Sequence, residues 1–169
     1  MSMALTNKLF CSSLAIALLG SCIRETKQKT AGLDSNEIIE EVKKASHAIT
    51  HYAAKADFDS LLACYADIPD FLAISNDGVA RKFPEYKAIC KSFYSAANGQ
   101  ELTTIQERFH VVDKNLVILT WTGNINALFK NGETWIMKNY TVTSVFQKIG
   151  DKWKVIHVHE SSLPPEVKK

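Results

Sequence analysis

Glycine and proline are scarce in this sequence, at 7 and 4 of 169 residues, and no long block of like charge occurs. These features exclude wholesale disorder and collagen-like repeats. The 20 Lys and Arg nearly balance the 18 Asp and Glu, which leaves a formal net charge of +2. Because a charge so close to zero argues against an electrostatic nucleic-acid binder, we expect no nucleic-acid partner. No stretch of about 20 apolar residues occurs, which excludes an ordinary membrane-spanning helix. The length and the 46% hydrophobic content suit one ordinary domain.

A short apolar segment near the N-terminus is typical of an export signal. Residues 9–20 form its core, which is too short to span a membrane, and it ends at Leu-Gly-Ser-Cys over 19–22. This ending resembles a bacterial lipobox, whose Cys becomes the lipidated first residue. The resemblance implies a lipoprotein signal peptide over 1–21 and a lipidated Cys22. The polar residues that follow show no periodicity, which predicts a tether over 22–34. We therefore expect an exported protein held to the membrane by its lipid alone, facing the periplasm or on the cell surface. An ordinary signal peptide with an incidental Cys is the alternative.

The rest of the chain has the pattern of helices followed by an antiparallel sheet. Apolar residues at helical spacing predict one helix over about 35–56 and a shorter one that Asp57 begins. A short strand over 71–74 and a third helix from Pro84 to before Asn98 come next. From there on the chain alternates as strands, with turns predicted at Lys114-Asn115, Asn131-Gly132 and Gly150-Asp151. This order indicates an α+β fold.

The last strands carry a resemblance to a known family. The segments TSVFQK over 143–148 and GDKWKVIHVHESS over 150–162 resemble the SnoaL-like branch of the nuclear transport factor 2-like superfamily. They are also similar to the association domain of calcium/calmodulin-dependent kinase II. The resemblance implies a cone of curved antiparallel sheet wrapped on about three N-terminal helices, over residues 35–163, with 164–169 as a C-terminal tail. It leaves the chemistry open, because the superfamily holds enzymes, binders and assembly modules.

The three predicted turns also predict which residues face each other across the sheet. With two-residue loops, one wall of a pocket against the helices is lined by Arg108, Trp121, Tyr140, Ser144, His157 and His159. In this register Gly123 faces Tyr140 and leaves room beside its ring. The opposite face is rich in β-branched residues and has no helix left to cover it. We therefore expect a homodimer that packs through Ile118, Val145, Ile156 and Val158.

The two histidines are the candidate catalytic groups. His157 and His159 share one face of a strand, and either would serve as a general base with Asp70 as its partner. The alternative is a pair of buried histidines whose hydrogen bonds are satisfied by neighbours such as Ser144. His110 would lie about 14 Å from His157, three strands away, which is too far for a shared zinc ion. We expect no metal and no cofactor.

Arg108 is the candidate anion-binding group. Beside Trp121 it would stack on the indole ring and present a forked donor to a small carboxylate. A strand-end Arg that reaches solvent is the alternative. Cys64 and Cys90 could form a disulfide after export, but both follow helical patterns, and we favour two separate thiols.

The expected function combines these observations. We expect an exported bacterial lipoprotein with a SnoaL-like domain that binds a small molecule in its cone, an anion being one option, or that serves as a dimeric interaction module. A lyase or isomerase with a pocket His as general base is the alternative. We favour binding over catalysis because no acid–base pair is visible in the pattern.

Overall fold

The computed structural model describes residues 34–169 of the chain. The predicted signal peptide, the lipidated Cys22 and the tether up to Leu33 lie outside these residues. The helices are α1 (Ser35–Ala54), α2 (Phe58–Leu62) and α3 (Phe83–Ala96), and the strands are β1 (Leu72–Ile74), β2 (Ala80–Arg81), β3 (Ala97–Asp113), β4 (Leu116–Phe129), β5 (Thr134–Ile149), β6 (Lys152–Ser161) and β7 (Glu166–Lys168). The predicted α+β class and the order of helices and strands are confirmed.

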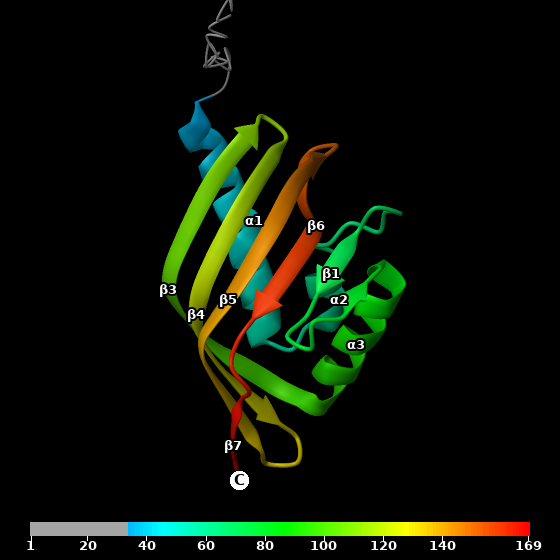
Figure 1. Cartoon of the computed structure of the whole chain (residues 1–169), viewed down its shortest axis with the longest axis vertical. Coiled ribbons are helices and arrows are strands. Elements are labelled where there is room, and N and C mark those ends of the chain that lie inside the picture. Colours follow the sequence, from blue (N-terminus) through cyan, green and yellow to red (C-terminus); the bar gives the residue numbers. More distant parts are fainter. Residues whose placement is uncertain (1–33) are drawn as a thin grey trace, which may run out of the picture.

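The strands form one curved, open sheet. Its order is β2-β1-β6-β5-β4-β3, and β7 pairs with the part of β5 that β6 does not cover. The segment expected to be a C-terminal tail therefore contributes a strand. Figure 1 shows α1 crossing the long strands on one face and α3 standing beside β1. Within the residues described, no helix is both long and apolar enough to cross a membrane.

Helices α1 and α2 each begin at an aspartate that caps the first turn. The side chain of Asp34 accepts the Asn36 N–H at 3.0 Å and begins α1. The side chain of Asp57 accepts the Ser60 N–H at 3.2 Å and begins α2, which confirms its role as a cap. A short polar side chain in this position satisfies one of the backbone donors that a helix start leaves free.

The core lies between α1 and the inner face of the sheet. Its fully buried side chains include Val42 of α1 together with Phe71, Val117, Phe146, Val155 and Val158. At one edge of this core, Glu41 of α1 accepts hydrogen bonds from Lys148 Nζ at 2.7 Å and from Trp153 Nε1 at 2.8 Å. These two bonds fix the helix across the β5–β6 hairpin.

The register of β4 against β5 matches the prediction around the site. Trp121 pairs with Val142, and Gly123 pairs with Tyr140. Nearer the turn the pairing is shifted by one residue. A bulge at Asn139, whose φ is 53°, shifts the pairing back by one residue. The predicted register therefore holds on the side of the bulge away from the turn, from Gly123 with Tyr140 onward.

The register of β5 against β6 is predicted correctly only near the turn. The Gly150-Asp151 loop holds the expected pairing as far as Phe146 with Val155. Beyond it, Ile156 is an extra residue in β6, so Ser144 pairs with Val158. One extra residue turns every later side chain to the other face of the sheet.

This bulge overturns part of the predicted wall and part of the predicted dimer surface. His157 and His159 now pair with Val145 and Thr143, on the face away from the helices. Val158, expected on the outer face, is 1% exposed and lies in the core. The bulge buries an apolar side chain and leaves the two imidazoles outside, which is the arrangement that the hydrophobic effect favours.

A second bulge moves Arg108. The Lys114-Asn115 turn forms as predicted, but the pairing shifts at Val112, so that Glu107 rather than Arg108 lies opposite Trp121. Arg108 instead pairs with Thr120 and is exposed on the outer face. The prediction that it lies beside Trp121 is wrong for this reason.

Candidate functional site

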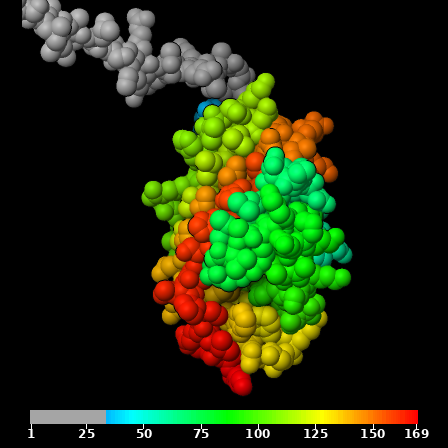
Figure 2. Space-filling view, turned by 45° about the vertical axis from the view of Figure 1, so that its right-hand side comes forward, coloured from blue at the N-terminus to red at the C-terminus, as the bar shows by residue number. Residues whose placement is uncertain are grey.

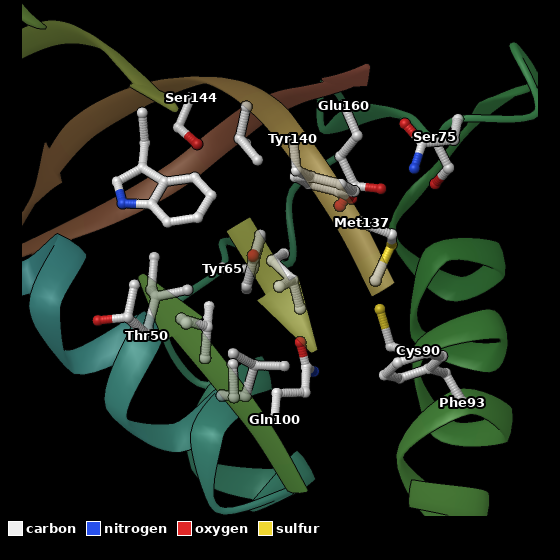
Figure 3. A pocket seen from close by; sticks show the side chains of 18 of the residues that line it. Thr50, Tyr65, Ser75, Cys90, Phe93, Gln100, Met137, Tyr140, Ser144 and Glu160 are labelled. Carbon is white, nitrogen blue, oxygen red and sulfur yellow. The ribbon is translucent and has the colours of Figure 1, made fainter. Parts of the chain in front are cut away.

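A cavity of about 430 Å³ lies between α1, α3 and the inner face of the sheet. Figure 3 shows Thr50 of α1 on one side, Cys90 and Phe93 of α3 on the other, and Tyr140 of β5 above. Its lining is mostly apolar, and the aromatic rings are Tyr65, Tyr86, Phe93, Tyr94, Trp121, Trp135 and Tyr140. On the outside, Figure 2 shows the β1–β2 region next to the C-terminal segment and α3 next to the β4–β5 hairpin.

Half of the predicted wall lines this cavity. Trp121, Tyr140 and Ser144 do so. Arg108, His157 and His159 do not, because the bulges turn them outward. Asp70, the predicted partner of a catalytic His, is exposed in the turn before β1 and is also absent from the lining. The predicted positive wall is therefore absent from the cavity.

Trp121 is held in the wall by contacts on both sides. Its indole N–H donates to the Thr104 hydroxyl at 2.9 Å. A Cβ placed at Gly123 would lie 2.3 Å from two carbons of the Trp121 ring and 2.5 Å from the Thr103 carbonyl oxygen. The space at Gly123, expected beside the Tyr140 ring, is therefore occupied by the indole. Only glycine fits at this position without moving the cavity wall.

Glu160, near the end of β6, is the titratable group that the sequence analysis missed. The bulge at Ile156 turns it to the inner face, where it lines the cavity. Burial raises the pKa of its carboxyl, and the charge of Asp77 raises it further. The hydroxyl of Tyr140, the charge of Arg81 and the hydroxyl of Ser75 oppose this rise. In Figure 3, Glu160, Tyr140 and Ser75 lie together at one end of the cavity.

The tyrosine beside Glu160 is strongly affected by the same environment. Burial raises the pKa of Tyr140, and the neighbouring charge of Glu160 raises it further. Tyr140 therefore stays a neutral hydrogen-bonding phenol at ordinary pH.

Asp77 also lines the cavity, but its charge is already paired. Arg81 Nη1 donates to Asp77 Oδ1 at 2.9 Å, and Nη2 donates to Oδ2. This pairing lowers the pKa of Asp77 to about 2. Among residues 34–169, no ion pair includes Glu160. The two carboxylates of the cavity thus have different surroundings.

The remaining polar groups of the site are neutral. Gln100 Nε2 donates to the Tyr94 hydroxyl at 3.1 Å. Burial raises the pKa of Cys90 to about 12, so this thiol stays protonated. Cys64 and Cys90 are both free, as favoured from the sequence. Within the described part of the chain, no group of three His, Cys, Asp or Glu side chains is placed to hold a metal ion.

The chain matches a family model described as a SnoaL-like domain over residues 42–165. It belongs to the SnoaL-like family. Its fold is that of the nuclear transport factor 2-like (NTF2-like) proteins, as the sequence resemblance implied. A search of curated proteins finds no match.

Solved structures of low sequence identity share this fold. A proposed dehydratase of the NTF2-like family from Streptomyces avermitilis has a TM-score of 0.68 and 17% identity, covering 77% of this chain and 99% of that one. A proposed aromatic ring hydroxylase from Novosphingobium aromaticivorans has a TM-score of 0.68 and 9% identity, covering 81% and 96%. The association domain of C. elegans CaMKII has a TM-score of 0.60 and 15% identity, covering 75% and 96%. At these identities the likeness shows the fold alone.

The environment of Glu160 predicts how its replacement changes stability. A carboxyl whose pKa is raised on folding destabilises the native state once the pH exceeds its ordinary value of 4.5. Glu160→Gln should therefore raise the free energy of unfolding, by about 1–3 kcal/mol at pH 8. The gain should shrink as the pH falls toward 4. Urea unfolding between pH 4 and pH 8 measures it.

Glu41→Gln is the matched control, with the opposite sign. Hydrogen bonds from Lys148 and Trp153 lower the pKa of Glu41. Its charged form therefore stabilises the fold above its ordinary pKa, and the substitution should lower stability at pH 8. A Glu160→Gln variant that is less stable than wild type at pH 8 would contradict the assignment of a partly buried carboxyl whose charged form destabilises the fold.

Proposed function

We propose that this domain binds a small, mostly apolar molecule in the cavity between α1, α3 and the sheet. The observation that carries the proposal is the cavity itself. Its volume of about 430 Å³, its aromatic lining and its few polar groups are typical of small-molecule sites. The NTF2-like neighbours described as a dehydratase and a ring hydroxylase support a small-molecule role in general terms.

The cavity does not support the anionic ligand considered from the sequence. Arg108 and the two histidines of β6 lie outside it. The charged side chains that line it are Glu160 and Asp77, both acidic. We therefore propose a neutral or cationic ligand.

Catalysis is the second candidate, and one observation favours it. Glu160 is a carboxyl of raised pKa that lies beside a phenol inside a cavity, which is a common setting for acid–base groups. A lyase or isomerase of this kind would use Glu160 as the general base. It would not use His157 or His159, which lie on the outer face.

We also propose that the protein is exported and anchored by a lipid on Cys22. The support is the sequence of residues 9–22, an apolar core that ends in Leu-Gly-Ser-Cys. The domain would then be held at a membrane surface by its N-terminus alone.

We further propose that the domain forms a homodimer through the outer face of β4, β5 and β6. Ile118 and Val145 are paired at the centre of this face and are only partly buried. Threonines such as Thr120 and Thr143 surround them on the same face. The likeness to the fold of an association domain supports a second copy as the partner.

The cavity proposal predicts a defined response to a ligand screen. A metabolite library screened by thermal shift on the full chain should yield hits that raise the midpoint of unfolding. A ligand present at 100 times its Kd should raise the free energy of unfolding by about 2.7 kcal/mol. Ser144→Leu fills the cavity wall and should abolish the shift, whereas Thr143→Leu, the next residue on the outer face, should keep it. Equal responses from the two variants would contradict binding in the cavity.

The same hits separate binding from catalysis. Incubated with the protein and followed by mass spectrometry, a ligand that is only bound stays intact. A product that forms with the wild type and not with Glu160→Gln would favour the lyase or isomerase.

The anchor predicts the mass of the mature protein. Protein extracted from a bacterial membrane fraction should begin at a diacylated or triacylated Cys22. Cys22→Ser should release it from the membrane or leave it unprocessed. An intact Met1, or a cleaved and unmodified terminus, would contradict the proposal.

The dimer predicts the effect of a single charge. Val145→Lys places a charge at the centre of the outer face and should give a monomer in size-exclusion chromatography with light scattering. Val79→Lys makes the same change in the β1–β2 turn, where Val79 is exposed, and should leave the dimer intact. A wild-type monomer at micromolar concentration would rule the dimer out.

A further inference from the structure

We propose that the cavity selects ligands that carry a cationic amine, and that Glu160 is the counter-ion for the ammonium group. This inference rests on the proposed function, because it names the chemical class of the molecule that the cavity binds. It is argued from the charges, the hydrogen-bonding capacity and the aromatic rings at one end of the cavity.

The first step is the charge of the lining. Its charged side chains are Glu160 and Asp77, and the part of the chain that the structure describes contributes no Lys, Arg or His to it. A ligand carboxylate or phosphate would meet the like charge of Glu160 there, with no cation of the lining to offset it. A cationic group would meet opposite charge.

The second step is that only one of the two carboxylates remains to be paired. Asp77 is bound by both terminal nitrogens of Arg81. Glu160 is in no ion pair of residues 34–169. Glu160 is partly buried. A carboxylate in such a place without an ion-pair partner is costly, and a cation beside it removes part of that cost. A cationic ligand would supply the ion-pair partner that Glu160 lacks among residues 34–169.

The third step is hydrogen-bonding capacity. An ionised carboxylate has about four acceptor positions. In Figure 3 the side chains of Tyr140 and Ser75 lie beside Glu160, and their two hydroxyl donors can occupy at most two of these positions. Positions remain for the donors of an ammonium group, which carries up to three N–H bonds and forms short, charge-assisted contacts with carboxylates.

The fourth step is the aromatic surroundings. Figure 3 shows the rings of Tyr65 and Tyr140 in the cavity near Glu160. Tyr86 of α3 also lines the cavity and lies 5.4 Å from Tyr65, ring centre to ring centre. The faces of such rings attract a cation, and the apolar walls beyond them suit the hydrocarbon part of an arylalkylamine.

A pH dependence follows from this pairing. The titratable groups around Glu160 are Tyr140 of β5, Asp77 and Arg81 of the β1–β2 region, Tyr65 after α2, and Tyr86, Cys90 and Tyr94 of α3. The tyrosines and Cys90 stay neutral at ordinary pH, since burial raises the pKa of each. Amine binding should therefore strengthen as the pH rises and Glu160 ionises, up to about pH 9, where amines begin to lose their proton.

The test uses three probes that share one ring and differ in charge: 2-phenylethylamine, 2-phenylethanol and phenylacetate. Titration calorimetry at pH 7.5 with the full chain in mild detergent gives the three affinities. The amine should bind about 10- to 100-fold more tightly than the alcohol. Phenylacetate should bind most weakly. The affinity of the amine should fall between pH 7.5 and pH 5, and that of the alcohol should not.

Two variants decide the role of Glu160. Glu160→Gln keeps the shape and removes the charge, so the amine should bind only as well as the alcohol, whose own affinity should change less than about 3-fold. Glu166→Gln removes the same charge from exposed β7 and should leave the preference for the amine intact. Circular dichroism and the unfolding midpoint confirm that both variants are folded.

The outcomes separate this inference from the proposal that it rests on. If the alcohol and the amine bind equally well to the wild type, or if Glu160→Gln keeps the preference, the counter-ion role is overturned. Cavity binding still stands in that case, provided that Ser144→Leu abolishes it. If none of the three probes binds up to millimolar concentration, the preference for an amine is overturned, and cavity binding is then decided by the library screen with Ser144→Leu.

Discussion

Burial of the inner face of the sheet against α1 is the constraint on which the rest of the structure depends. Val155 and Val158 are 0% and 1% exposed in that layer. Strict alternation from the β5–β6 turn would place His157 in the layer and Val158 outside it. The bulge at Ile156 reverses this, and burying one such side chain stabilises the fold by about 1.5–3 kcal/mol. The same extra residue turns Glu160 inward, so the carboxylate of the cavity is a consequence of packing Val158.

Local sequence signals predicted the elements of the fold well and its registers in part. Helix caps such as Asp57 and loops such as Gly150-Asp151 act over a few residues, and both are as predicted. A turn fixes the pairing only as far as the next bulge, however. The bulges at Val112 and Ile156 depend on how distant segments pack against the strands. The sequence of a single turn does not predict that packing. The sequence did contain one signal for the bulge at Ile156. Val158 lies between His157 and His159, and only an extra residue before it turns the apolar side chain rather than the histidines toward the core.

The candidate site shows the same division. Trp121, Tyr140 and Ser144 were placed correctly because the β4–β5 pairing holds around them. Arg108, His157 and His159 were misplaced because each lies beyond a bulge. This difference changes the charge of the site: the sequence predicted a positive wall, whereas the charged side chains that line the cavity are acidic. In this SnoaL-like domain, a shift of one residue in strand pairing thus changes which side chains line the cavity. The chemistry of the cavity depends on that register as much as on the composition of the strands.

The pair between Asp77 and Arg81 has an evolutionary consequence. Arg81 is held by Asp77, yet its charge already acts on Glu160. Loss of the Asp77 carboxylate would leave the Arg81 guanidinium without its partner, and its positive charge would then act on Glu160 without the opposing charge of Asp77. The proposed preference of the cavity for cations is therefore sensitive to a single substitution, in a loop that tolerates change better than the sheet does. Relatives of this chain could diverge in ligand charge without any alteration of the core.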